Sequence, residues 1–136
     1  MGVLIAMAAL AAQAAAAEPR WEPLAEEGGV AMAIDPASIA RSGATVRFTL
    51  RGSTQRPQPD GSTSGLMELE VDCTGRSGTL HGGRSFLPDG QVAQETRIPP
   101  AQRQAQPLRS ASALDQAIYA RVCGGALAPD PAGAAQ

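Results

Sequence analysis

The sequence predicts an α+β fold, with an antiparallel sheet of about five to six strands and one C-terminal helix packed on one face and tethered by a disulfide. Three observations support this class. Several short segments alternate apolar and polar residues with the period of two that is typical of half-buried strands. Turn-forming sequences separate them. One late segment carries apolar residues at helical spacing and ends at one of the two cysteines.

The first part of the chain has the pattern of a leader. Residues 3–17 carry no charge, and the run ends in Ala15, Ala16 and Ala17 before Glu18. It is shorter than the roughly 20 apolar residues of a spanning helix, and its small terminal residues suit signal peptidase. We expect a signal peptide over residues 1–17, a domain over 18–124 and a flexible tail over 125–136. The alternative for the first segment is a buried or interfacial helix.

Alternation and turn signals locate the strands. They are expected at residues 20–24, 30–34, 45–50, 66–73, 79–86 and 91–98. Asp35 followed by Pro36 predicts one helical turn after the second of these strands. Residues 51–64 hold glycine, proline and polar side chains without an apolar anchor, so an exposed, mobile loop is expected there.

The strand at 66–73 has two distinct faces. Its apolar face holds Met67, Leu69, Val71 and Cys73. Its other face holds Glu68, Glu70 and Asp72. Carboxylates spaced two apart on a strand point along a solvated face about 7 Å apart, so we expect them to face water and not to hold a metal ion.

The predicted helix covers residues 110–123. Ser110 or Ser112 is the candidate N-cap, and Gly124 ends the helix. The apolar stripe consists of Leu114, Ile118 and Val122, with Cys123 at its edge. Such a helix can lay its stripe on the apolar face of the sheet.

Two cysteines allow a single pairing. An even count in an exported chain favours a disulfide between Cys73 and Cys123, and the spacing of 50 residues does not suit a zinc site or a CxxC motif. Because Cys73 is in phase with the buried face and Cys123 ends the helix, the bond is expected to tie helix to sheet. The alternative is two free thiols. No cofactor is expected.

Composition and motifs argue against several functions. The net charge is −2 and all eleven basic residues are arginines, which suggests neither nucleic acid nor an anionic membrane as partner. No nucleophile elbow, zinc-protease or phosphate-loop motif occurs. His81, the only histidine, is expected on the surface. A serine hydrolase would instead need this histidine in contact with a serine. We therefore expect no catalytic residue and no enzyme.

A set of short motifs resembles the surface-adhesin protein E family of Gram-negative bacteria. The likeness spans about residues 20–124. The matching residues are Trp21, Asp35-Pro36, Ser38-Ile39, Val71 to Cys73, Phe86, Gly90, Ile98-Pro99 and Val122-Cys123. The chain departs from the pattern at Thr96, where the family has Trp before the Ile-Pro step. The resemblance implies a sheet of about six strands with a helix tethered by Cys73 and Cys123.

The resemblance also implies an exported, non-enzymatic, protein-binding domain in the periplasm or on the outer cell surface. The family's adhesin binds host matrix and serum proteins, plasminogen among them. Plasminogen binding typically relies on lysine, and this chain has none. The resemblance therefore leaves the ligand of this chain open. An accessory or stability subunit of an envelope assembly is the alternative, and a small hydrolase the third. A protein partner or a homodimer is expected, without membrane insertion after cleavage.

Overall fold

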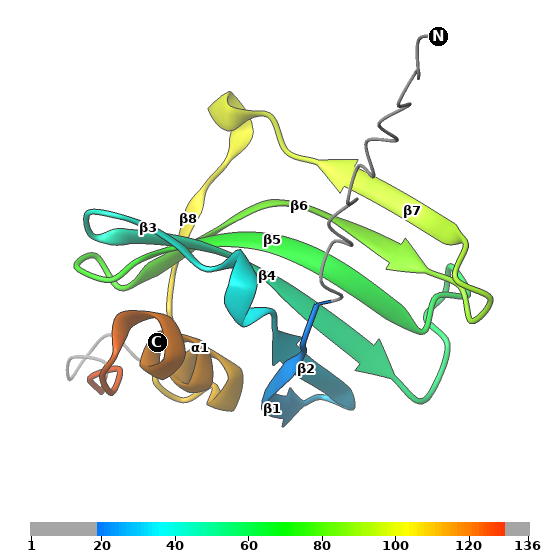
Figure 1. Cartoon of the computed structure of the whole chain (residues 1–136), viewed down its shortest axis with the longest axis horizontal. Helices are drawn as coiled ribbons and strands as arrows, with labels where there is room; N and C mark the ends of the chain where they lie inside the picture. The colour runs from blue at the N-terminus through cyan, green and yellow to red at the C-terminus, as the bar shows by residue number, and fades with distance from the viewer. Residues whose placement is uncertain (1–18, 130–136) are drawn as a thin grey trace, which may run out of the picture.

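The computed structural model describes residues 19–129, which form one curled antiparallel sheet with a single helix (Figure 1). The strands are β1 (Glu22–Glu27), β2 (Val30–Ile34), β3 (Ala40–Ser42), β4 (Thr45–Thr54), β5 (Ser64–Asp72), β6 (Ser77–Phe86), β7 (Val92–Arg97) and β8 (Ala105–Pro107). Two 3-10 turns, η1 (Pro36–Ser38) and η2 (Pro100–Gln102), and the helix α1 (Ala113–Cys123) complete the fold. The leader expected at 1–17 lies outside the described residues.

The strand order confirms the predicted fold class. The main path is β1-β2-β4-β5-β6-β7, while β3 pairs with β4 and β8 pairs with β6. Every pairing is antiparallel. The sequence did not predict β3 and β8, because three exposed residues are too few to show an alternating pattern.

The core lies on the inner face of this sheet. Val46, Phe48 and Leu50 of β4 are buried as their alternation predicts. Register sets Phe48 opposite Leu69 and Val46 opposite Val71, so both strands turn the same face inward. Because apolar side chains gain about 25 cal/mol per Å² removed from water, this shared face drives the pairing.

Several strand boundaries differ from the expectation. Strand β1 runs to Glu27 rather than ending at Leu24, and the turn consists of Gly28 and Gly29 alone, both at positive φ. Two such residues make the hairpin turn that matches strand twist. Strand β4 continues to Thr54, since Arg51 to Thr54 find ladder partners on β2 and β5. The predicted loop at 51–64 therefore shortens to residues 55–63.

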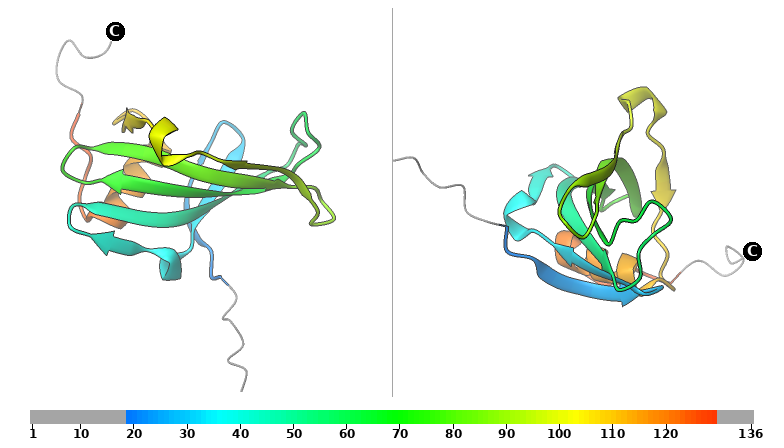
Figure 2. Two further views of the ribbon diagram at one scale, coloured as in Figure 1. Left: turned by 90° about the horizontal axis from the view of Figure 1, so that it is seen from above. Right: turned by 90° about the vertical axis from the view of Figure 1, so that its right-hand side faces the viewer.

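Helix α1 begins at Ala113, later than the expected 110, because Ser112 rather than Ser110 is its N-cap, and it ends at Cys123 as predicted. The Ser112 hydroxyl accepts a hydrogen bond from the Asp115 N–H at 3.2 Å, and Gly124 adopts the left-handed conformation that closes the last turn. Ile118 and Val122 are buried in the core cluster. The end-on view shows the sheet curling around the helix (Figure 2, right).

The segment after α1 is partly anchored, which corrects the expectation of a flexible tail from residue 125. Leu127 is buried, and its N–H and carbonyl both bond the Gln116 side chain, at 3.2 and 3.1 Å. The structure does not describe residues 130–136. Within residues 19–129, no helix has the length and apolar character that crossing a membrane requires.

Candidate functional site

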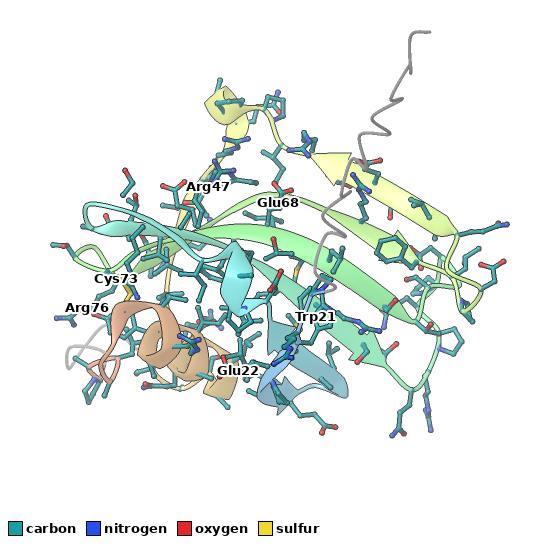
Figure 3. The ribbon with its side chains drawn as sticks, viewed as in Figure 1. Trp21, Glu22, Arg47, Glu68, Cys73 and Arg76 are labelled. Atoms are coloured by element: carbon teal, nitrogen blue, oxygen red, sulfur yellow. A yellow bond between two sulfur atoms is a disulfide. The ribbon has the colours of Figure 1, made fainter. Side chains whose placement is uncertain are left out.

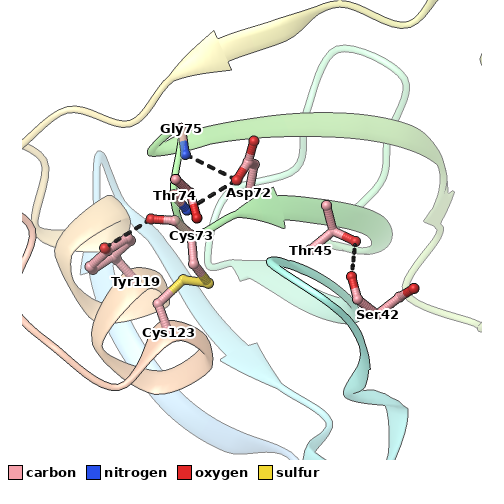
Figure 4. The surroundings of a disulfide bond; sticks show 8 residues. All are labelled: Ser42, Thr45, Asp72, Cys73, Thr74, Gly75, Tyr119 and Cys123. Carbon is pink, nitrogen blue, oxygen red and sulfur yellow. Dashed lines mark hydrogen bonds between the residues drawn. A yellow bond between two sulfur atoms is a disulfide. The ribbon is translucent and has the colours of Figure 1, made fainter.

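The disulfide fixes α1 to one end of the sheet. Cys73 follows the last residue of β5 and bonds Cys123 in the final turn of the helix, with the two Cα atoms 5.6 Å apart (Figure 4). The Tyr119 hydroxyl donates to the Cys73 carbonyl at 3.1 Å. The Asp72 carboxylate turns the chain by accepting from the N–H groups of Thr74 and Gly75. The predicted tether of helix to sheet is thus confirmed.

The helix is too short to cover the whole inner face. At 1.5 Å per residue its 11 residues extend about 16 Å, whereas the 10 residues of β4 extend about 33 Å. The disulfide holds α1 at the end of the sheet where β5 finishes. The inner face at the opposite end, where β4 and β6 finish, lies clear of the helix (Figure 1).

An open groove of about 430 Å³ occupies this uncovered end. Its apolar lining comes from Val30, Met32, Leu66, Met67 and Leu80. Its polar lining consists of Arg84 and of uncharged side chains, among them Gln58, Ser62, Ser85, Gln94 and Thr96. Leu80 is 38% exposed, which is unusual for a leucine on a core-facing strand position and shows that the groove is open to solvent.

Glycines on three neighbouring strands form the floor of the groove. Gly52 lies opposite Gly65, and Gly83 lies one strand further, opposite Met67. A Cβ at Gly83 would lie 2.7 Å from the Leu66 carbonyl oxygen, and one at Gly65 would lie 3.0 Å from that of Arg84. The close approach of neighbouring strands therefore requires glycine here, and the missing side chains leave the trench.

The loop at residues 55–63 forms one wall of the groove. Asp60 secures it, since its carboxylate accepts from the Ser62 N–H and from the Ser85 hydroxyl of β6, both at 2.9 Å. These hydrogen bonds, those from Ser62 foremost, hold the pKa of Asp60 below its usual value. Ser62 itself is buried. The wall is therefore a folded structure, although the sequence predicted a mobile loop.

The outer face of the sheet carries the charged residues. Figure 3 shows Arg47 and Glu68 on the side of the sheet away from α1. Glu68 lies 3.6 Å from Arg97, and Glu95 lies 3.2 Å from Arg84. Because acidic residues pair with arginines, their charges largely cancel on this face. No group of acidic, histidine or cysteine side chains within residues 19–129 has the geometry of a metal site.

His81 is buried, which corrects the expectation of a surface histidine. It is the extra residue of a β-bulge, because Gly82 pairs with Glu68 and Leu80 pairs with Leu69. Its side chain is 6% exposed, and Nε2 lies 2.9 Å from Glu70 Oε2. Its Nδ1 is buried without a hydrogen-bond partner in the structure. Neither ring nitrogen contacts a serine, so the arrangement that a serine hydrolase needs is not formed by the described residues.

The sequence did not reveal the groove. A partial signal was present, since Gly52, Gly65 and Gly83 each lie within a strand, and glycine inside a strand often marks a close approach of another backbone. The three glycines form the floor of the groove only because strand register places them side by side, which the sequence does not show.

Comparison with known proteins agrees with this architecture. The selenomethionine form of protein E from Haemophilus influenzae is similar at a TM-score of 0.50, with 15% identity over 79% of this chain and 95% of that chain. A second crystal form of the same protein gives a TM-score of 0.49 at 17% identity, over 79% and 97% of the two chains. At 15% identity the likeness to the first of these structures shows the fold alone.

Two sequence comparisons complete the picture. A search of curated protein sequences finds no match. The family model described as surface-adhesin protein E matches residues 21–124, which include all eight strands, the helix and both cysteines. The chain therefore belongs to the surface-adhesin protein E family.

Proposed function

We propose that this chain is an exported, non-enzymatic, protein-binding domain whose binding surface is the open groove. The observation that carries the proposal is the uncovered inner face, because a soluble domain does not ordinarily leave an apolar trench open without an occupant. Membership of an adhesin family supports binding as the activity. Concave, mostly apolar surfaces with a few polar groups are the usual form of binding sites.

The lining favours binding over catalysis. Arg84 is the one ionisable residue among those that line the groove in the described part of the chain, and its guanidinium pairs with Glu95. General acid–base or nucleophilic chemistry needs a titratable or activated group in contact with substrate. The buried His81 of β6 contacts Glu70 of β5 and does not line the groove.

Export is consistent with the tether. Disulfides form and persist in oxidising compartments, and in this domain one joins the helix to the sheet. The family description places its members at the cell surface. With the leader expected at residues 1–17, we assign the mature domain to the periplasm or the outer surface of a Gram-negative envelope.

Site-specific photo-crosslinking in the native cells tests the proposal. A photoreactive amino acid replaces Leu80, which lies in the groove, and in a matched control it replaces Arg41, an exposed residue of β3 at the other end of the sheet. We expect discrete protein adducts at position 80 and none, or far fewer, at position 41. Equal labelling at both positions, or no adduct at position 80, contradicts the proposal.

The identity of the adducts separates the candidate roles. A fixed set of envelope proteins indicates an accessory subunit of an envelope assembly. Proteins from outside the cell indicate an adhesin. An adduct of twice the mass of the chain indicates a homodimer.

A further inference from the structure

The outer edge of β7 is open. In the described chain β7 pairs with β6 alone, and β8 returns to a different part of β6 without covering β7. An edge strand presents a row of unpaired N–H and C=O groups that another extended chain can pair with. The strand carries no proline, one of the devices that block such pairing.

Strand register identifies the free groups. The Ile98 N–H donates to the His81 carbonyl at 3.0 Å, and Thr96 lies opposite Gly83. Because successive residues of a strand point their N–H groups to opposite sides, the N–H groups of Glu95 and Arg97 face away from β6. Both residues are exposed. An incoming strand would therefore meet the backbone at Glu95 and Arg97.

The same strand borders the groove. Gln94 and Thr96 alternate with Glu95 and turn their side chains into the groove lining. The sheet curls, so a strand added outside β7 continues that curl across the open side (Figure 2, right). Its inward side chains would then face the groove from the β7 side, as Val30 and Met32 of β2 approach Gly52 from the other side.

The chemistry of the lining selects the occupant. Hydroxyl and amide groups offer hydrogen bonds to a peptide backbone, and an acyl chain would leave them without partners. The one lining charge is already paired with Glu95. A charged side chain in the groove would lose its hydration without gaining a counterion, so the inward residues of the occupant must be apolar or small and uncharged.

We infer that β7 binds an extended segment of a partner protein by strand addition, with alternate uncharged side chains of that segment inserted in the groove. The inference rests on the proposed function, for which it names the mode of binding. Hydrogen bonds between the two backbones give affinity, and the groove gives specificity for every second side chain of the bound segment.

Selection from a displayed random octapeptide library against the oxidised full domain tests the inference. We expect enriched peptides with alternating, uncharged apolar residues. Glu95→Pro removes the outward N–H, at an edge position where proline does not break the β6–β7 ladder. It should weaken their binding by about tenfold or more, since it removes a backbone hydrogen bond and the ring also obstructs pairing. The control Glu95→Ala removes the carboxylate, keeps the N–H and should change affinity by no more than about twofold.

Three results of the peptide experiment overturn the inference. They are the absence of any enriched peptide, enriched peptides without alternation, and equal binding to the proline and alanine variants when circular dichroism shows both folded. A dimer that Glu95→Pro dissociates shows pairing with a second copy and also overturns it. If Leu80 crosslinks persist in Glu95→Pro, the groove binds partners by another mode and the proposed function stands.

Discussion

The pair formed by His81 and Glu70 joins a buried imidazole to a partly buried carboxylate. Its imidazole is almost fully buried, and Glu70 provides the one partner of the ring through Nε2. A polar ring that is buried without a partner loses its hydrogen bonds to water, and this loss destabilises the fold. The contact therefore contributes to stability, and this explains the position of a histidine that takes no part in the proposed site.

Removal of Glu70 tests this assignment. Glu70→Ala leaves both ring nitrogens buried without partners, so the free energy of unfolding should fall by about 1–3 kcal/mol. Glu68 provides a matched control two residues away on the same face, with a more exposed carboxylate 3.6 Å from Arg97. Glu68→Ala should cost less than about 1 kcal/mol, as surface ion pairs do. Urea denaturation with the disulfide intact measures both, and equal losses would contradict the assignment.

Core side chains are predictable from the sequence where strand alternation is unbroken. Val46, Phe48 and Leu50 follow this pattern, and all three are buried. His81 does not, because a β-bulge adds one residue to β6 and changes the phase of the strand at that point. The bulge depends on pairing with β5, which local sequence does not encode. The burial of His81 was therefore beyond prediction from β6 alone.

At the scale of elements, α1 combines local signals with one long-range bond. Ser112 and Gly124 set its ends through contacts within a few residues, so the sequence predicts its boundaries well. Its position depends instead on Cys123, whose partner is 50 residues earlier. The predicted phase of Cys73 on its strand and of Cys123 on the helix was sufficient to place this contact.

Cys123→Ala should lower the melting temperature strongly. In the chain-entropy model, closing a loop of 50 residues stabilises the fold by about 4 kcal/mol. For a domain of this size that corresponds to a decrease of about 15 °C. Differential scanning calorimetry of oxidised protein measures it.

The controls are Cys73→Ala and the double variant, both of which should match the single variant within error, because each removes the same bond. An unchanged melting temperature would show that α1 is held by packing alone. A double variant much less stable than either single variant would show that the two side chains act separately.

Over the whole molecule, the relation between helix and sheet determines the candidate site. One short helix anchored at one end leaves the other end of a longer sheet uncovered. The sequence predicts the helix, the sheet and the tether, but not the groove on the uncovered end of the sheet. The groove follows from curvature and from glycines brought together across β4, β5 and β6, which are relations between strands and not patterns within one.

The mature molecule should begin at Glu18 and carry the oxidised bond. The family match starts at residue 21, so removal of residues 1–17 leaves every matched residue in place. A domain whose total stability is about 5–15 kcal/mol cannot readily forgo a contribution of about 4 kcal/mol, which requires an oxidising compartment. Intact-mass spectra of protein from the native envelope should give the 18–136 chain, heavier by two hydrogens after reduction. A chain that retains residues 1–17, or two thiols that react with an alkylating reagent before reduction, would contradict both the export and the tether.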